Sequence, residues 1–166
     1  MTLRLLGGGL LLVAAFWIGR YASDRLRSRP RQLRSLIDAL EILRADIFAL
    51  APLSEAMLHA GGVAGCGGAF LKRVASRLER ENRMLDAIWI EELQSVPLRP
   101  QERDSLCALG TQLGKYDVPT QLRALERCIC DLERWEREAT EKTRAEAGLR
   151  LRLIGAAGGL LLILLW

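Results

Sequence analysis

Two uncharged, apolar segments at the ends of the chain limit its fold more than any other feature. Residues 5–19 read LLGGGLLLVAAFWIG, and residues 153–166 read LIGAAGGLLLILLW. Each segment is shorter than the roughly 20 apolar residues of a typical membrane-spanning helix. Arginines flank both segments, and a bilayer accepts a short span when such side chains reach the headgroup layer or the bilayer thins locally. The sequence therefore predicts two transmembrane helices, over residues 1–22 and 149–166.

Three other structures suit apolar segments of this length less well. A cleaved signal peptide needs a cleavage site after its apolar core, but Arg20 follows residues 5–19 directly and no A-x-A site precedes a mature start. A buried core helix is a further alternative for either segment. An amphipathic surface helix is disfavoured because neither segment has a polar face.

Basic residues predict which side of the membrane holds the middle of the chain. Only Arg4 lies on the far side of either apolar segment. The other flanking arginines lie on the inner side, at Arg20, Arg25, Arg27, Arg29, Arg31, Arg34, Arg144, Arg150 and Arg152. Because cytoplasmic loops carry an excess of Lys and Arg, we expect residues 23–148 in the cytoplasm and both termini outside it. The four cysteines then lie in a reducing compartment, where disulfides are rare.

Composition predicts an all-α domain for residues 23–148. Half of the residues of the chain are hydrophobic and only 5% are aromatic. Leucine and alanine, which favour helices, far outnumber the β-branched valine and threonine. The net charge is +4, but the basic excess lies beside the two ends, and residues 35–148 are acidic overall. A general nucleic-acid-binding protein would carry its basic patch on the folded domain, so composition argues against that function.

Apolar residues recur at helical spacing through this domain. Leu36, Leu40, Leu43, Ile47 and Leu50 are separated alternately by four and three positions, which predicts one buried helix face. Prolines mark several boundaries between helices. The expected helices cover residues 31–50, 52–61, 69–81, 84–95, 101–113 and 118–166. Since the last helix is long and continuous into the membrane, the predicted architecture is a cytoplasmic antiparallel helical bundle between two transmembrane helices.

The sequence offers few candidates for catalysis or metal binding. His59 is the only histidine, so no site with two histidines can form within the chain. Cys128 and Cys130 point to different sides of a helix and match neither a C-x-x-C redox motif nor a zinc knuckle. The glycine-rich residues 61–68 have phosphate-loop spacing, but lack the Lys and the Ser or Thr of that motif, which favours a flexible linker. We therefore expect no enzyme activity, no cofactor and no metal site.

One helix–helix junction, residues 109–121, is the best candidate for a functional surface. In a structural hypothesis, Gly110 permits close helix packing, Gly114 ends one helix and Asp117 caps the next. In a docking hypothesis, the exposed side chains also contact a protein partner. The candidate residues are Leu109, Gly110, Leu113, Gly114, Lys115, Tyr116, Asp117 and Gln121. In the second predicted span, Gly155 and Gly159 form a G-x-x-x-G pattern that allows close helix packing in lipid.

The junction resembles the signature of the stage III sporulation protein AB family, through the pattern Leu109-Gly110-x-x-Leu113-Gly114-x-x-Asp117-x-x-x-Gln121. The segment from Arg29 to Arg34 is similar to that family's entry into its first cytoplasmic helix. The start of the second helix at Pro52 and the glycine-rich segment after Leu153 are also similar to the family's pattern. The resemblance covers nearly the whole chain.

The resemblance implies a membrane component of a secretion-like channel complex that assembles between mother cell and forespore during endospore formation. Its cytoplasmic domain would be similar to the helical domain of the type II secretion inner-membrane F protein. The implied partners are an ATPase of the stage III sporulation protein AA type and other channel components. The implied location is the cell membrane, with the bundle on the mother-cell side of the outer forespore membrane. The alternative function is that of a membrane-tethered regulatory or ligand-sensing helical protein.

Overall fold

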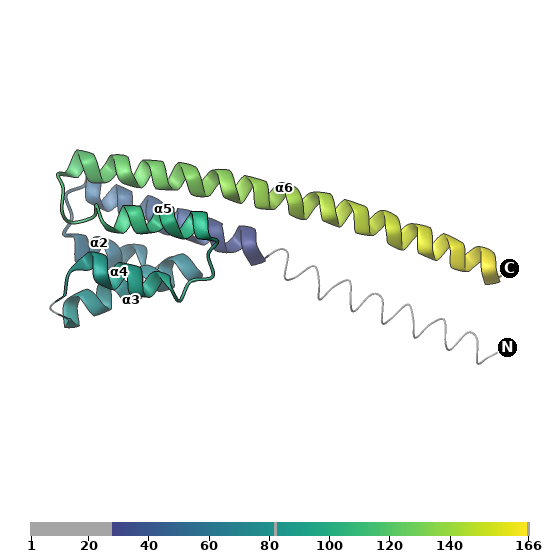
Figure 1. The fold of residues 1–166 in the computed structure, drawn as a ribbon, viewed down its shortest axis with the longest axis horizontal. Helices are drawn as coiled ribbons and strands as arrows, with labels where there is room; N and C mark the ends of the chain where they lie inside the picture. The colour runs from purple at the N-terminus through teal and green to yellow at the C-terminus, as the bar shows by residue number, and fades with distance from the viewer. Residues whose placement is uncertain (1–27, 82, 166) are drawn as a thin grey trace. The chain divides into compact units, whose positions relative to one another are not determined.

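The computed structural model describes residues 28–81 and 83–165, with side chains as far as residue 145. Within these residues the chain is all-α, as the composition predicts (Figure 1). The expected first span, residues 1–22, lies outside the described residues. Residues 149–165 are helical, but the packing of Gly155 and Gly159 also lies outside the description. In the described part of the chain, no helix has an apolar stretch long enough to cross a membrane.

Six helices cover most of the described residues, and each corresponds to one expected from the sequence. They comprise residues 28–48, α2 (Leu53–Ala60), α3 (Cys66–Arg80), α4 (Leu85–Leu93), α5 (Pro100–Gly110) and α6 (Val118–Leu165). The chain divides into a compact unit of Arg31–Arg137, called the bundle below, and a second unit that contains the chain on either side of it.

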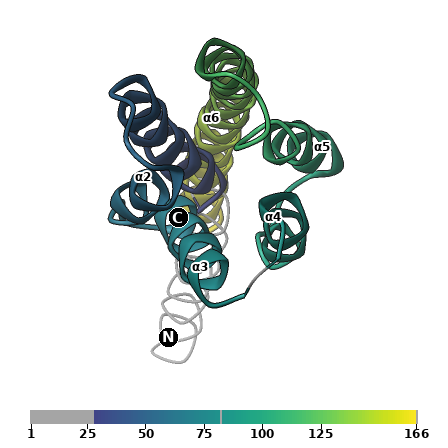
Figure 2. The same cartoon turned by 90° about the vertical axis from the view of Figure 1, so that its left-hand side faces the viewer.

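Successive helices of the bundle are neighbours around its axis (Figure 2). α2 packs against α3, α3 against α4, and α4 against α5. The guanidinium of Arg44, in the 28–48 helix, lies 3.6 Å from the carboxylate of Glu126 in α6. The first and last helices of the bundle are therefore also neighbours, and the helices form a closed ring. Inside this ring of helices, the aromatic side chains of Phe70 and Trp89 pack edge to face, with their centroids 4.8 Å apart. The fully buried leucines Leu36, Leu40 and Leu43 confirm the predicted apolar face of the first described helix.

The sequence prediction was wrong about Leu50, which does not continue that buried face. The helix ends at residue 48, and Leu50 has a φ of +62° with 76% of its surface exposed. The Ala51 amide donates to the Asp46 carbonyl and the Leu50 amide to the Ile47 carbonyl, both at 3.0 Å. This is the Schellman arrangement that ends many helices, and its left-handed position is usually glycine.

The predicted flexible linker over residues 61–68 was also wrong at its C-terminal end, where α3 already begins at Cys66. Gly67 and Gly68 are buried. A Cβ added to Gly67 would lie 2.7 Å from the Cα of Leu36, so the two backbones are in close contact. The hydroxyl of Ser35 accepts a hydrogen bond from the Gly67 amide at 3.1 Å and donates one to the Ala64 carbonyl at 3.0 Å. Ser35 therefore caps α3 from another helix.

Candidate functional site

The junction predicted at residues 109–121, called the corner below, joins α5 to α6 at one end of the bundle. Its apolar members Leu109, Gly110 and Leu113 are buried. A Cβ added to Gly110 would lie 2.6 Å from Cγ of Trp89, because the indole lies directly on this part of α5. The Trp89 Nε1–H donates a hydrogen bond to the Leu106 carbonyl at 2.8 Å. These members of the corner therefore hold α4 against α5.

The turn of the corner depends on Gly114 and Gln121. Gly114 has a φ of +73°, a conformation that glycine adopts without the steric cost of a side chain. The Gln121 side-chain oxygen accepts a hydrogen bond from the Gly114 amide at 3.3 Å. Its side-chain amide donates to the Tyr116 carbonyl at 2.6 Å. The side chain of Gln121 thus connects Gly114 and Tyr116 of the loop to the beginning of α6. This is a structural role.

Asp117 occupies the position before α6, as expected for a cap residue. Its backbone carbonyl accepts hydrogen bonds from the amides of Thr120 at 3.0 Å and Gln121 at 3.1 Å. In the described residues its carboxylate makes no hydrogen bond to the first turn of the helix. Asp117 therefore occupies the expected position, but its side chain does not make the expected capping bond, and the side chain of Gln121 holds the loop before α6 instead.

The exposed members of the corner are Gly114, Lys115, Tyr116 and Asp117. The Lys115 ammonium lies 2.5 Å from the Asp86 carboxylate of α4, and this hydrogen bond lowers the pKa of Asp86. The Tyr116 ring is exposed, while its carbonyl belongs to the turn. The structure thus divides the predicted residues into a packed set and a solvent-facing set. The side chains of Lys115, Tyr116 and Asp117 can contact a partner without unfolding the corner.

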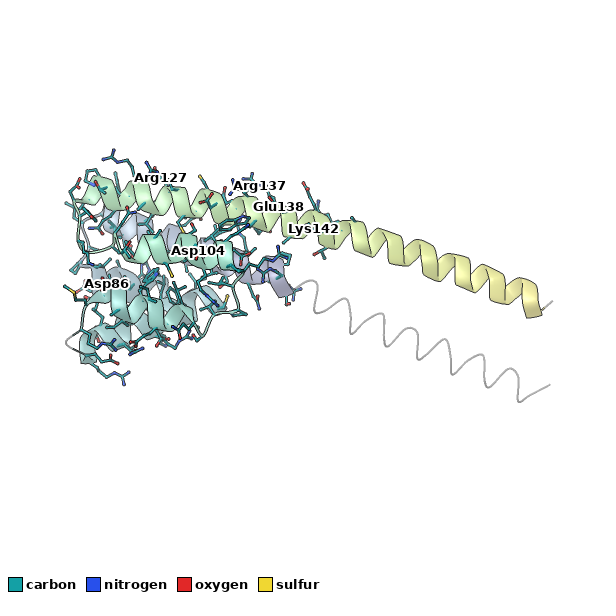
Figure 3. The ribbon with its side chains drawn as sticks, in the orientation of Figure 1. Asp86, Asp104, Arg127, Arg137, Glu138 and Lys142 are labelled. Carbon is teal, nitrogen blue, oxygen red and sulfur yellow. The ribbon has the colours of Figure 1, made fainter. Side chains whose placement is uncertain are left out.

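A shallow groove between α5 and α6 lies beside the corner. Its volume is about 290 Å³, and it is lined by Ser105, Ala108, Leu109, Gln112, Ala124, Arg127, Cys128 and Asp131. Arg127, which is labelled in Figure 3, lines the groove from α6. Burial raises the pKa of Cys128 to about 11, so its thiol is protonated at neutral pH and is a poor nucleophile. Both polar and apolar side chains line the groove, and sequence periodicity gave no sign of it.

The histidine and the two neighbouring cysteines that the sequence analysis considered have structural roles in the bundle. The His59 Nδ1 lies 2.7 Å from the Asp46 carboxylate and joins α2 to the 28–48 helix. Cys128 is buried whereas Cys130 is exposed, so the two sulfur atoms are on different sides of α6. Within the residues that were searched, no three His, Cys, Asp or Glu side chains come together as a metal site would require.

Comparison with known proteins identifies the same family that the residue pattern of the corner resembles. The family model described as stage III sporulation protein AB matches residues 4–166. The chain belongs to the stage III sporulation protein AB family. The stage III sporulation protein AB of Bacillus subtilis (strain 168) is 30% identical over 169 residues, which cover 98% of each chain.

A solved structure supports the fold of this family member. It is titled stage III sporulation protein AB (SpoIIIAB) and superposes with a TM-score of 0.61 at 24% identity. The superposition covers 68% of this chain and 94% of the solved one. The sequence resemblance was therefore correct, and a role in sporulation follows from the family.

Proposed function

We propose that this member of the stage III sporulation protein AB family is a membrane-anchored platform in a secretion-like channel complex. In this proposal it docks an ATPase of the stage III sporulation protein AA type to the membrane components of the channel. The observation that carries the proposal is the family match from residue 4 to residue 166, which includes both apolar ends as well as the bundle. A platform needs rigid surfaces, and the closed ring of helices supplies them.

The proposal includes a location and an orientation. In this proposal the residues before 23 and after 148 anchor the chain in the cell membrane. The bundle then lies in the cytoplasm, on the mother-cell side of the outer forespore membrane. The excess of arginine on the inner side of both apolar segments supports a cytoplasmic bundle. A reporter fused after Trp166 should behave as extracytoplasmic, and one inserted near Gly65 as cytoplasmic. The reverse pattern would show that the arginine asymmetry does not orient this chain.

Docking of the ATPase is tested by co-purification from sporulating cells. The tagged full-length chain should retain the ATPase, whereas a tagged membrane protein of unrelated function should not. An absence of the ATPase from the retained proteins would contradict the platform function.

The groove between α5 and α6 favours a second function, the sensing of a small ligand. A ligand that binds the folded state raises the melting temperature by mass action. Stabilisation by a metabolite in the absence of any protein partner would support the sensor. This function also predicts that Arg127→Ala, at the edge of the groove, abolishes the stabilisation.

A further inference from the structure

The groove between α5 and α6 is built from equivalent positions on its two helices. α5 ends and α6 begins at the corner, so the two helices run antiparallel along the groove (Figure 1). Each helix lines the groove with four residues, and in both helices these residues lie at positions i, i+3, i+4 and i+7. Such positions share one face of a helix. The groove is therefore a track about two helical turns long, with one helix face on each side.

The apolar part of the groove is made of small or buried side chains. Leu109, Ala124 and Cys128 are buried, and Ala108 is exposed at the edge. Because the Cys128 thiol stays protonated, these side chains carry no charge. The volume of about 290 Å³ lies at the lower end of the range for ligand pockets, which is roughly 300–1,000 Å³. The groove therefore suits a molecule of few atoms with a short apolar part.

Arg127 brings an unpaired positive charge to the groove. In the part of the chain that the structure describes, its guanidinium makes no ion pair and no hydrogen bond. The carboxylate of its neighbour Glu126 lies instead 3.6 Å from Arg44 of the 28–48 helix. The side-chain amide of Gln112, which lines the groove from α5, is likewise without a partner among the described residues. A guanidinium binds a carboxylate through two parallel hydrogen bonds, and an amide can donate another.

Asp131 brings a negative charge one helical turn further along α6. Its Oδ1 accepts a hydrogen bond from Arg134 at 3.1 Å. Its Oδ2 lies 3.5 Å from the hydroxyl of Ser105, beyond the roughly 3.0 Å upper limit of an ordinary O–H···O hydrogen bond. This oxygen can therefore accept a shorter and stronger hydrogen bond from a charged donor such as an ammonium group.

The two opposite charges of the groove are not paired with each other. Arg127 and Asp131 are four positions apart on α6, a spacing at which opposite charges often pair, yet the described ion pair of Asp131 is with Arg134. Four positions on a helix correspond to about 6 Å along its axis. A ligand that is only an anion would be repelled by Asp131, and one that is only a cation would be repelled by Arg127. A small molecule that carries both charges matches the groove.

We propose that the groove between α5 and α6 binds a free α-amino acid with a short apolar side chain. Arg127 and Gln112 donate hydrogen bonds to its carboxylate, and Oδ2 of Asp131 accepts one from its ammonium group. Its side chain lies on the apolar surface formed by Leu109 and Ala124. This proposal rests on the ligand-sensing function given above and names the class of its ligand. It is independent of the platform function.

The test measures binding of three small probes to the full-length chain in detergent. L-2-aminobutyrate carries both charges, butyrate lacks the ammonium group, and propylamine lacks the carboxylate. Isothermal titration calorimetry gives the dissociation constants. At a concentration about 20-fold above its dissociation constant, L-2-aminobutyrate should raise the melting temperature by about 4 °C or more. Butyrate and propylamine should each bind at least about tenfold more weakly, because each lacks one charged contact.

Variants test the groove as the place of binding. Arg127→Ala and Asp131→Asn should each weaken the binding of L-2-aminobutyrate by about tenfold or more. Arg127→Lys should restore part of the affinity, since it keeps the charge but not the two parallel hydrogen bonds. Ala108→Leu should block the groove without removing a charge. Arg123→Ala on α6 and Asp104→Asn on α5 are matched controls that should bind as the wild type does, because neither residue lines the groove.

Four outcomes would contradict the proposal. Binding of butyrate or propylamine as tight as that of L-2-aminobutyrate would overturn the amino-acid class. Wild-type affinity in both Arg127→Ala and Ala108→Leu would overturn the assignment to the groove. If L-2-aminobutyrate did not bind but another metabolite stabilised the chain, the class would be wrong and the sensing function would stand. If no metabolite stabilised the chain, the sensing function itself would be contradicted.

Discussion

The indole ring of Trp89 lies directly against the backbone of Gly110, where any side chain would collide with it. The same indole donates its Nε1–H to the Leu106 carbonyl at 2.8 Å. One residue of α4 thus fills the space left by a missing side chain on α5 and bonds to the preceding turn. The family pattern Leu109-Gly110 therefore has a packing reason, which is independent of any partner.

Gly110→Ala tests this packing. The added methyl group must displace a fully buried indole, and overpacking of this kind costs about 1–3 kcal/mol, with a further contribution if the hydrogen bond to Leu106 is lost. The free energy of unfolding, measured on the full chain in detergent, should fall accordingly. Ala108→Ser, on the exposed side of the same helix, should change it by less than about 0.5 kcal/mol. Wild-type stability in Gly110→Ala would show that the contact is looser than described.

Gln121→Ala should lower stability rather than affect only docking. Its side chain bonds to the Gly114 amide and the Tyr116 carbonyl, and two partly exposed hydrogen bonds contribute about 1–2 kcal/mol together. Lys115→Ala loses only a surface ion pair with Asp86, so its melting temperature should stay within about 2 °C of the wild-type value. A comparison of the two melting curves distinguishes the structural residue from the surface residue. Equal melting temperatures would contradict this division of the corner.

Ser35→Ala should remove the cap that α3 receives from the 28–48 helix. The loss leaves the amide of Gly67 buried without its partner, which costs about 1–2 kcal/mol. Ser76→Ala, on α3 itself, is the control and should be nearly neutral. Denaturant unfolding monitored by circular dichroism measures both changes. If the two variants unfolded at the same denaturant concentration, the Ser35 hydroxyl would have no capping role.

Acid should weaken the contact between α3 and α4. Hydrogen bonds from Arg83 and Arg77 lower the pKa of Glu91 from 4.5 to about 2. A carboxyl group whose pKa is depressed by folding stabilises the fold above its ordinary pKa, and this contribution is lost as the pH falls from about 4.5 to about 2. The melting temperature of the wild type should decrease over this range, and that of Glu91→Gln should decrease less. Identical acid profiles would exclude Glu91 from the contact.

Local signals in the sequence were sufficient for the helices. The spacing of Leu36, Leu40 and Leu43 predicted a buried face, and the prolines marked the approximate boundaries. The failures at Leu50 and at residues 66–68 have different physical causes. At Leu50 the helix ends in a left-handed conformation that apolar spacing does not predict. At residues 66–68 the backbone depends on a hydroxyl supplied by a helix 32 residues away.

The position of the candidate site was predictable from the sequence, but the contacts of its individual residues were less so. The glycines and the amide of the corner drew attention to residues 109–121, and the structure shows why Gly114 and Gln121 occur together. In the described residues the carboxylate of Asp117 makes no bond to the first turn of α6, whereas the side chain of Gln121 bonds to the loop that precedes the helix. The start of α2 could not be connected with the corner from sequence, since only the fold brings Leu53 close to Gly114.

The bond between Ser35 and Gly67 also determines when α3 can be complete. A ribosome releases residue 35 long before residue 67, so the serine is present when the glycine amide emerges. A fragment that begins after residue 48 would lack this hydroxyl, and the first turn of its α3 would fray. Deuterium uptake at the Gly67 amide therefore reports whether the whole bundle is assembled, although the amide belongs to a single helix.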